Sequence, residues 1–224
     1  MADNKSINWK RTEKWSLLLV ILVIIINAIV QHDSVPALIS AVCGITYTFL
    51  AGKGLPVCYL YGVTGSSFYA FLSYQNALWG NLLLYLGYYL PMQILGYFRW
   101  NKNLKSGRSD IIKITLPKKE LSLLLSLLAI LSVFVYFILL RFNDAHPLLD
   151  SITTVFSIGG MYLTVRRAIE QWIFWMGVNA LSLAMWIDVA LDGAKVYSTI
   201  IMWAVYLILA FYFYFIWYKE IKKT

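Results

Sequence analysis

Charged residues are scarce in this chain. They make up 13% of its 224 residues, whereas 60% are hydrophobic and 17% are aromatic, and the mean hydropathy is +0.68. Soluble globular domains carry about 25% charged residues. The composition therefore excludes an ordinary water-soluble fold and indicates that lipid surrounds most of the chain.

Cysteine and histidine are scarce too, with two of each. Cys43 and Cys58 lie in different apolar segments without metal-ligand or redox spacing, so we expect two buried, apolar thiols. His32 and His146 lie in predicted outer turns with no third ligand nearby in the sequence. We therefore expect no metal ion and no other cofactor.

Motifs of catalysis are missing as well. The chain contains no Walker loop, no Gly-x-Ser-x-Gly and no His-Glu-x-x-His, so we do not expect an enzyme. All eleven acidic residues fall in loops or near the ends of apolar segments. Coupling to protons or sodium usually requires a carboxylate or a histidine in mid-membrane. The pattern therefore argues against ion coupling.

Long apolar segments are what the chain has in abundance. A helix needs about 20 residues to cross a hydrocarbon core of roughly 30 Å, and short polar turns separate blocks of about that length. The predicted fold class is an all-α integral membrane protein. The eight predicted transmembrane helices are Trp15–Val30, Val35–Leu50, Leu55–Tyr74, Leu78–Phe98, Leu121–Leu140, Leu148–Val165, Trp172–Val189 and Val196–Tyr218.

Basic residues predict the orientation of these helices, because cytoplasmic loops retain Lys and Arg. Eight spans place both termini on one side of the membrane. That side holds every Lys and Arg except Arg141 and Lys195, which is 17 of the 19. We therefore predict cytoplasmic termini. The formal charge of +8 then reflects topology and contact with anionic lipid headgroups, and no nucleic-acid partner is expected.

The sequence also contains a weak internal repeat. Four spans in each half is an even number, so both halves enter the membrane from the same face and the repeat is parallel. The basic segment Arg99–Lys119 is the natural linker between the halves. An offset of 113 residues aligns Phe49 with Tyr162, Lys53 with Arg166, and Tyr59 with Trp172.

The strongest candidate for a binding site is Trp172-x-x-Trp175-x-x-x-Asn179 in the seventh segment. On a helix this spacing places the three side chains along one stripe. An asparagine midway along a span is costly in lipid, so Asn179 should face protein or a water-filled cavity. The alternative is that Asn179 forms a hydrogen bond between helices and that Trp172 is an interfacial aromatic residue.

A second candidate set lies in the fourth segment. Tyr88 and Gln93 bring a phenol and an amide to membrane depth. Pro91 between them removes a backbone donor, which predicts a kink or a freed carbonyl. Tyr47, by contrast, lies near the end of its segment and is interpreted as an interfacial residue.

Several of these motifs resemble the PnuC family of vitamin transporters. Besides Trp-x-x-Trp-x-x-x-Asn, the similar blocks are Tyr59-Leu-Tyr-Gly62, Ser67-Phe-Tyr-Ala-Phe-Leu-Ser-Tyr74, and Tyr88-Tyr-Leu-Pro-Met-Gln93 followed by Gly96-Tyr97 and Trp100. The resemblance covers nearly the whole chain from about Trp15 onward. It implies that the substrate-binding residues are Trp172, Trp175, Asn179, Gln93 and Tyr88.

The same resemblance implies a SWEET-like fold within a single membrane domain, residues 1–224. Two three-helix bundles, residues 35–98 and 148–218, would be joined by a linking helix, 121–140. An extra helix, 15–30, would precede them. The family also implies a multi-pass homotrimer in the lipid of the bacterial inner membrane.

Members of the family carry nicotinamide riboside into bacteria, by facilitated diffusion with alternating access, and we expect that function here. Related uptake of thiamine, riboflavin or a deoxynucleoside is the alternative. Stacking does not decide between nicotinamide riboside and thiamine, because an indole attracts the cationic ring of each. The alternative of another class is a membrane-embedded enzyme or assembly protein, with the segment Arg99–Lys119 as its docking surface.

Overall fold

The computed structural model describes residues 11–32, 34–75, 79–106, 108–142, 147–191 and 197–223. Within these ranges the regular secondary structure is helical, and the only β pairing is two isolated bridges. The chain divides into two compact units, which we call unit 1 (Met1–Ile112) and unit 2 (Lys113–Thr224). Their boundary falls inside the predicted linker.

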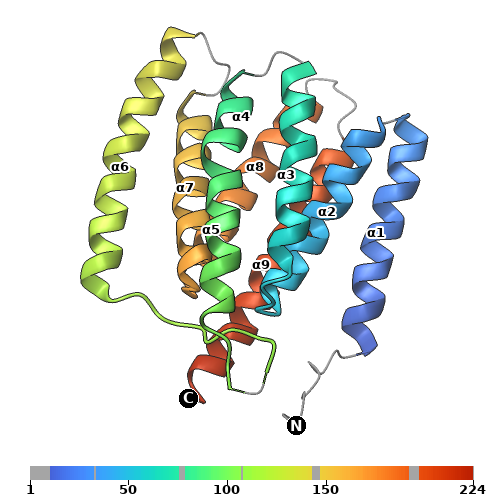
Figure 1. Ribbon diagram of the computed structural model, residues 1–224. Coiled ribbons are helices and arrows are strands. Elements are labelled where there is room, and N and C mark those ends of the chain that lie inside the picture. The colour runs from blue at the N-terminus through green and yellow to red at the C-terminus, as the bar shows by residue number, and fades with distance from the viewer. Residues whose placement is uncertain are drawn as a thin grey trace. The chain divides into compact units, whose positions relative to one another are not determined.

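Helices in unit 1 pack mainly against their neighbours in the chain, α1 on α2, α2 on α3, and α3 on α5 (Figure 1). The start of α2 is fixed locally, because Ser34 Oγ accepts the Ala37 N–H and a proline occupies the first turn. The elements of unit 1 are α1 (Arg11–Gln31), α2 (Val35–Gly52), α3 (Cys58–Gln75), α4 (Trp79–Leu84), the π-helical turn η1 (Tyr85–Tyr89) and α5 (Leu90–Asn101).

The turn η1 joins α4 and α5 without a break. The Leu90 N–H donates to the carbonyl of Tyr85, five residues back. Pro91 follows at once and has no N–H to donate, so the wider turn lies where the proline interrupts the α-helical ladder. The predicted irregularity around Pro91 is confirmed, and it takes the form of a π turn.

Unit 2 also packs its helices in chain order, α6 on α7, α7 on α8, and α8 on α9 (Figure 1). A Cβ at Gly159 would lie 2.5 Å from Leu128 Cδ1 of α6 and 2.8 Å from Phe174 Cε1 of α8, so this glycine lets both helices approach α7. Leu128 and Phe174 belong to the apolar core of the unit. The elements of unit 2 are α6 (Lys118–Arg141), α7 (Pro147–Arg166), α8 (Gln171–Leu191) and α9 (Tyr197–Ile221).

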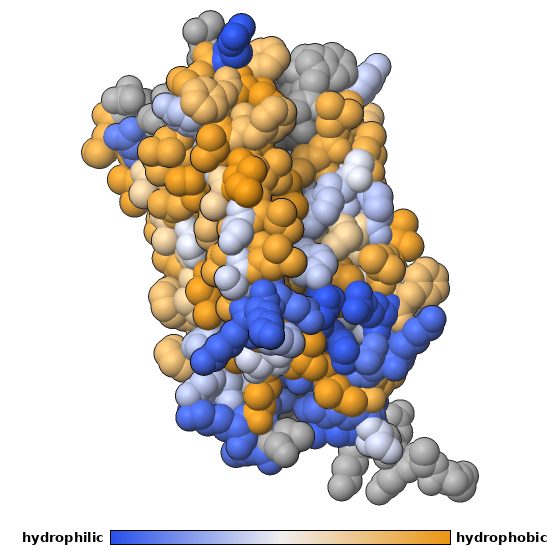
Figure 2. Space-filling view, turned by 90° about the vertical axis from the view of Figure 1, so that its left-hand side faces the viewer, coloured by the Kyte–Doolittle hydropathy of each residue, from blue (hydrophilic) through white to orange (hydrophobic). Residues whose placement is uncertain are grey.

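The helices coincide with the predicted segments to within a few residues, once α4, η1 and α5 are taken together. The all-helical membrane class is confirmed. On the face drawn in Figure 2, apolar residues cover most of the surface, and hydrophilic residues gather toward the end where the linker lies. Five described segments are long and apolar enough to cross a membrane: Arg11–Val30, Val35–Gly52, Lys118–Arg141, Pro147–Arg166 and Ile200–Ile221.

The turn between α2 and α3 is built like the turn between α7 and α8. Gly54 and Arg167 are 113 residues apart, and both have a positive φ, of 73° and 64°. Gly54 N–H donates to the Ala51 carbonyl at 2.9 Å, and Arg167 N–H donates to the Thr164 carbonyl at 3.0 Å. In both turns the next N–H donates to the carbonyl five residues back, at 3.0 Å. The two turns therefore share one hydrogen-bond pattern at the offset found in the sequence.

The linker donates a hydrogen bond to the equivalent carbonyl in each of these two turns. Ile111 N–H donates to the Gly54 carbonyl at 3.0 Å in unit 1, and Ile114 N–H donates to the Arg167 carbonyl at 3.0 Å in unit 2. Residues 112 and 113 alone separate the two anchors. The linker is thus held to both units through equivalent backbone groups, which supports the internal repeat.

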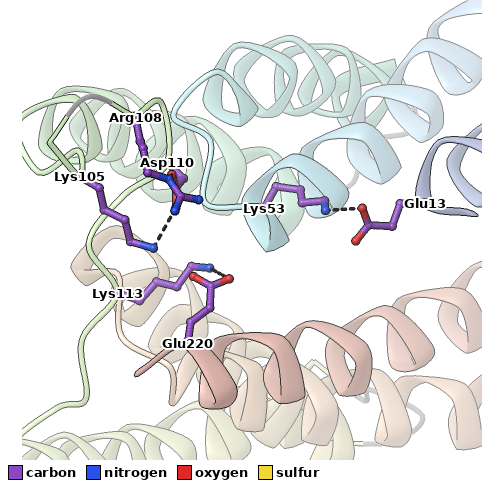
Figure 3. Close-up of polar contacts among 7 residues, drawn as sticks. All are labelled: Glu13, Lys53, Lys105, Arg108, Asp110, Lys113 and Glu220. Carbon is purple, nitrogen blue, oxygen red and sulfur yellow. Dashed lines mark hydrogen bonds and ion pairs between the residues drawn. The ribbon is translucent and has the colours of Figure 1, made fainter. Parts of the chain in front are cut away.

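An ion pair joins the first helix of each unit to the end of the second. Glu13 on α1 pairs with Lys53, which caps α2 (Figure 3). Glu120 on α6 pairs with Arg166 at the end of α7, with Nη2 and Oε2 2.9 Å apart. Each glutamate is the third residue of its helix. In each unit, therefore, an ion pair of the same kind joins the first two helices.

Candidate functional site

Trp172 lies at the start of α8, turned toward α9. Its ring centroid lies 5.6 Å from those of Phe213 and Trp217, which are one turn apart on α9, and all three side chains are buried. The indole Nε1 is enclosed and has no hydrogen-bond partner among the described residues. In this conformation Trp172 is part of the aromatic contact between α8 and α9.

Trp175 is turned toward α7 instead. Its Nε1 donates to Thr164 Oγ1 at 3.2 Å, and a Cβ at Gly160 would lie 3.1 Å from Trp175 Cε2. The indole remains half-buried. Residues three apart on a helix are separated by about 60° around its axis. That angle is why Trp172 and Trp175 contact different helices although they belong to one predicted stripe.

Asn179 lies one turn beyond Trp175, on the same side of α8. It is 5% exposed, and Ser182 further along the helix is buried as well. Thr164 Oγ1 also donates to the Gly160 carbonyl at 2.8 Å, so α7 presents a hydroxyl to this part of α8. Unit 2 therefore gathers an indole, a carboxamide and hydroxyls along α7 and α8.

Gln93 on α5 is the centre of a matching cluster in unit 1. Its Nε2 donates to Ser66 Oγ of α3 at 3.0 Å, and both side chains are buried. The Gln93 Oε1 is enclosed, and no donor reaches it within the part of the chain that the structure describes. Buried amide oxygens are nearly always hydrogen bonded. This oxygen is therefore a buried acceptor that lacks a donor in the described residues.

Tyr88 lies in η1 and is half-buried, with its ring centroid 5.7 Å from that of Tyr89. Tyr85 in the same turn stacks on Tyr69 of α3 at 4.4 Å. Tyr88 belongs to the π-helical turn, and Gln93 follows five residues later in α5.

Three residues at these clusters were not among the predicted site residues, namely Tyr47, Ser66 and Thr164. Tyr47, interpreted from the sequence as interfacial, lies inside unit 1, where its ring centroid is 5.9 Å from that of Tyr59. The repeat could have revealed Ser66, because an offset of 113 aligns it with Asn179. Thr164 carries no comparable signal.

Asp110 is a buried carboxylate that pairs with two other residues of the linker in unit 1. Lys105 Nζ lies 2.9 Å and Arg108 Nε 2.6 Å from its oxygens (Figure 3). Burial by itself raises the pKa of Asp110, but the two cations outweigh burial, and the pKa lies below its usual range. Asp110 is therefore charged at neutral pH, next to the bridge between Leu104 and Ile111.

Glu170 binds the linker on the side of unit 2. Its Oε1 and Oε2 accept the Leu116 N–H at 3.0 and 3.1 Å. Burial raises the pKa of Glu170, and its backbone hydrogen bonds offset only part of that effect. Lys113 at the unit boundary pairs with Glu220 at 2.8 Å (Figure 3). Its Nζ also lies 5.0 Å from the centroid of the Trp217 ring.

No second candidate site is found in the described ranges. An open pocket of about 230 Å³ at the loop end of unit 1 has apolar walls and contains none of the predicted site residues. No group of three His, Cys, Asp or Glu side chains that could hold a metal ion occurs in the described ranges, and His146 lies outside them. Cys43 and Cys58 are free thiols; Cys58 is buried and Cys43 half-buried.

Comparison with known families gives a match over most of the chain. The model of a family described as "Nicotinamide mononucleotide transporter" matches residues 34–219. The chain belongs to this family. It is accordingly a multi-pass membrane protein of a transporter family, and the resemblance found in the sequence is confirmed.

Relatives in this family match along nearly their whole length. Proteins named nicotinamide riboside transporter PnuC from Neisseria mucosa and Haemophilus influenzae are each 30% identical to the chain over 96% of it, and the matches cover 84% and 93% of the relatives. The protein of that name from Escherichia coli is 25% identical over 62% of the chain and 67% of its own length. A crystal structure described as that of the vitamin B3 transporter PnuC matches with a TM-score of 0.81 and 28% identity, over 96% of this chain and 94% of that one.

Proposed function

We propose that the protein carries nicotinamide riboside across a bacterial inner membrane. The observation that carries this proposal is the match to relatives named for that transport, at 30% identity over 96% of the chain. The residues of the two polar and aromatic clusters are what such a solute requires.

Nicotinamide riboside has a pyridinium cation, a carboxamide and ribose hydroxyls. An indole face attracts a cation with about 0.5–2 kcal/mol, and more where water is excluded. Trp175 is half-buried and keeps part of its ring accessible. The Asn179 amide and the free Gln93 Oε1 supply a donor and acceptors for the carboxamide or the ribose.

We propose the five predicted residues as the binding set, with unequal weight. Trp175, Asn179 and Gln93 contribute most, because each presents a stacking surface or a buried polar group. Trp172 is sealed against Phe213 and Trp217 and contributes mainly by holding α8 on α9. Tyr88 lies in η1 and its ring contacts that of Tyr89, so we assign it a smaller, flanking role.

The transport cycle that we propose is facilitated diffusion with alternating access, in a homotrimer with both termini cytoplasmic. Support comes from the distribution of basic residues and from the position of acidic residues at helix ends. The equivalent turns and ion pairs in the two units favour a parallel repeat of SWEET type. The fold we propose has eight spans, two three-helix bundles, a linking helix and an N-terminal helix.

Reconstituted protein tests the function directly. Liposomes containing the purified protein should take up labelled nicotinamide riboside until inside and outside concentrations are equal, with no imposed proton or sodium gradient. A sodium or proton gradient should leave the final level unchanged. Accumulation above the outside concentration that depends on either gradient would rule out the uncoupled mechanism.

Competing substrates separate the alternatives. Thiamine, riboflavin and a deoxynucleoside should each compete more weakly than unlabelled nicotinamide riboside for the same uptake. If thiamine competes better, the thiamine alternative is correct. Mass spectrometry of the solute after incubation should show intact vitamin, whereas a chemically altered product would identify an enzyme.

A further inference from the structure

The repeat allows residues of the two units to be compared position by position. The shared hydrogen bonds of the two turns fix the offset at 113 residues for the helices on both sides of each turn. At this offset Tyr47 corresponds to Gly160, Gly62 corresponds to Trp175, and Ser66 corresponds to Asn179.

Large and small residues have exchanged places between these equivalent positions. In unit 2 the glycine is on the first helix of the pair, Gly160, and the aromatic ring that packs on it is Trp175 of the second helix. In unit 1 the glycine is on the second helix, Gly62, and the ring that packs on it is Tyr47 of the first. A Cβ at Gly62 would lie 2.8 Å from Tyr47 Cδ2. Each unit therefore has one aromatic ring at this level, contributed by opposite helices.

The Tyr47 ring lies beside the polar cluster of unit 1. The same Cβ at Gly62 would lie 3.1 Å from Gln93 Cδ, so the phenol ring and the Gln93 amide border one glycine. Gln93 in turn donates to Ser66, the residue that corresponds to Asn179. Tyr47 thus lies beside Gln93, and Gln93 in turn binds the residue equivalent to Asn179.

Exposure distinguishes Tyr47 from a residue that only fills space. Tyr47 and Tyr59 are in edge contact, but Tyr59 is 0% exposed whereas Tyr47 is half-buried. Tyr47 is therefore not sealed in the core, and it lies next to the unpartnered acceptor of Gln93. Trp175 shows the same combination of a glycine on one side and partial exposure.

We propose that Tyr47 is a specificity-determining residue of unit 1, and that its ring stacks on the heteroaromatic cation of the transported solute while Gln93 binds a polar group of the same solute. The inference rests on the proposed function, since it assigns a further contact to that solute. The π face of a phenol is negative and attracts a pyridinium ring. Tyr47 therefore favours a cationic ring over a neutral ring of the same shape.

Binding measurements on the detergent-purified full chain test the assignment. The probes are nicotinamide riboside and its reduced dihydro form, whose ring has nearly the same size but no charge. We expect Tyr47→Leu to raise the Kd for the cation at least tenfold and the Kd for the neutral form less than threefold, in titration calorimetry. Tyr61→Leu is the matched control, because Tyr61 is 42% exposed on the neighbouring helix, and it should leave both constants within twofold.

A graded variant keeps the test informative if Tyr47→Leu folds poorly. Tyr47→Phe should bind the cation within threefold of the parent protein, because the ring carries the interaction. Replacing that phenylalanine with its mono-, di- and trifluorinated forms weakens the π face at nearly constant size. The Kd for the cation should then rise with every fluorine, by at least threefold over the series, while the Kd for the neutral form stays constant.

The outcomes separate this inference from the proposed function. If the parent protein binds neither probe, the proposed function is wrong. If the parent protein binds and Trp175→Leu weakens binding, but the fluorinated series is flat, only the assignment of Tyr47 is overturned. An equal loss for the charged and neutral probes in Tyr47→Leu, or a loss of more than tenfold in Tyr47→Phe, overturns it as well.

Discussion

Unit 1 and unit 2 share their backbone hydrogen bonds but differ in how side chains fill the equivalent space. Gly54 and Arg167 adopt the same left-handed turn, and both carbonyls accept an N–H from the linker. At the level of the polar clusters, however, the aromatic ring comes from α2 in unit 1 and from α8 in unit 2. Turn geometry is thus kept where the backbone requires it, and side-chain contacts have diverged at the residues that we propose for binding.

The two glutamate ion pairs give the sharpest test of that comparison and the largest expected effect. Glu13 and Lys53 have side chains that are 4% and 12% exposed, whereas Glu120 and Arg166 are 49% and 23% exposed. Breaking a buried pair leaves an unpaired charge and costs about 3–5 kcal/mol, whereas an exposed pair contributes about 0–1 kcal/mol. We therefore expect Glu13→Gln to destabilise the protein by about 3 kcal/mol and Glu120→Gln by less than 1 kcal/mol.

Thermal unfolding of both variants in the same detergent measures this difference. Glu13→Gln should melt at a clearly lower temperature, and Glu120→Gln should melt within a few degrees of the parent protein. Equal shifts would mean that the two pairs are equally buried in the folded protein and that the units do not differ here.

The second prediction concerns the cluster in unit 2. Trp175→Ala removes the half-buried indole and Asn179→Ala removes the buried carboxamide, so each should raise the Kd for nicotinamide riboside about tenfold to a hundredfold, which is about 1.4–2.7 kcal/mol. Titration calorimetry gives the constants, and size-exclusion chromatography shows whether the assembly is intact. Trp172→Phe, which keeps an aromatic ring between Phe213 and Trp217, should change the Kd by less than threefold.

An unchanged affinity in Trp175→Ala and Asn179→Ala would assign both side chains to helix packing. The alternative raised from the sequence, an asparagine that only joins helices, would then be correct. A large loss in Trp172→Phe would reverse the weights that we give to the two tryptophans.

The third prediction compares two tightly packed glycines. A Cβ at Gly96 would lie 2.3 Å from Cζ and 2.4 Å from Cε1 of Tyr59, a rigid ring that is fully buried. A Cβ at Gly159 would lie 2.5 Å from Leu128 Cδ1, the far end of a flexible side chain, and 2.8 Å from Phe174 Cε1. Overpacking a core costs about 1–3 kcal/mol, so Gly96→Ala should fall at the upper end and Gly159→Ala at the lower end.

Melting temperatures again give the readout. The two variants make the same chemical change, so a difference between them reports the rigidity of the neighbour. If Gly159→Ala lowers the melting temperature more than Gly96→Ala, the contact of α6, α7 and α8 in unit 2 tolerates an added methyl group less well than the contact between Gly96 and Tyr59.

Sequence patterns predicted the helices and their class well, because hydrophobic blocks of about 20 residues and the charges between them are decided locally by the membrane. They predicted an irregularity near Pro91 for the same reason, since a missing N–H has a local effect. The motif around Trp175 and Asn179 could be recognised, but the separate directions of Trp172 and Trp175 could not. Trp175 packs on a glycine of α7, Gly160, and Trp172 packs on two rings of α9. The two directions therefore depend on the neighbouring helices.

Tyr47 shows why the remainder of the site was beyond sequence reasoning. Its position near the end of a segment predicts an interfacial residue, and only the contact with Gly62 on the next helix places its ring inside unit 1. Gln93 was predicted as a site residue, but the sequence does not show that its Oε1 lacks a hydrogen bond. Ser66 binds only the amide nitrogen of Gln93, and that is known only from the structure. Contacts between helices decide both cases, and neither leaves a periodic signal in the chain.

The smallest predicted effect compares the two carboxylates that act on the linker. The pKa of Asp110 is lowered in the folded protein, so its contribution to stability is present above the unfolded value near 3.8 and is lost as the pH falls through the lower, folded value. The pKa of Glu170 is raised, so the sign is reversed: its contribution is present below the unfolded value near 4.5 and is lost as the pH rises through the folded value.

Matched amide variants should therefore respond to pH in opposite ways, Asp110→Asn as the pH falls below 3.8 and Glu170→Gln as the pH rises above 4.5. Asp110→Asn should be less stable than the parent protein by about 1 kcal/mol at pH 7, because Lys105 and Arg108 are 29% and 49% exposed and water solvates them when the carboxylate is removed. The difference in stability should narrow toward acid as the parent's own carboxylate is protonated. Glu170→Gln keeps an acceptor for the Leu116 N–H and cannot ionise, so the parent protein should lose stability relative to it as the pH rises. Melting curves at several pH values measure how the stability difference between each variant and the parent protein changes with pH. Changes of the same sign for both variants would show that the pKa values of Asp110 and Glu170 are shifted in the same direction.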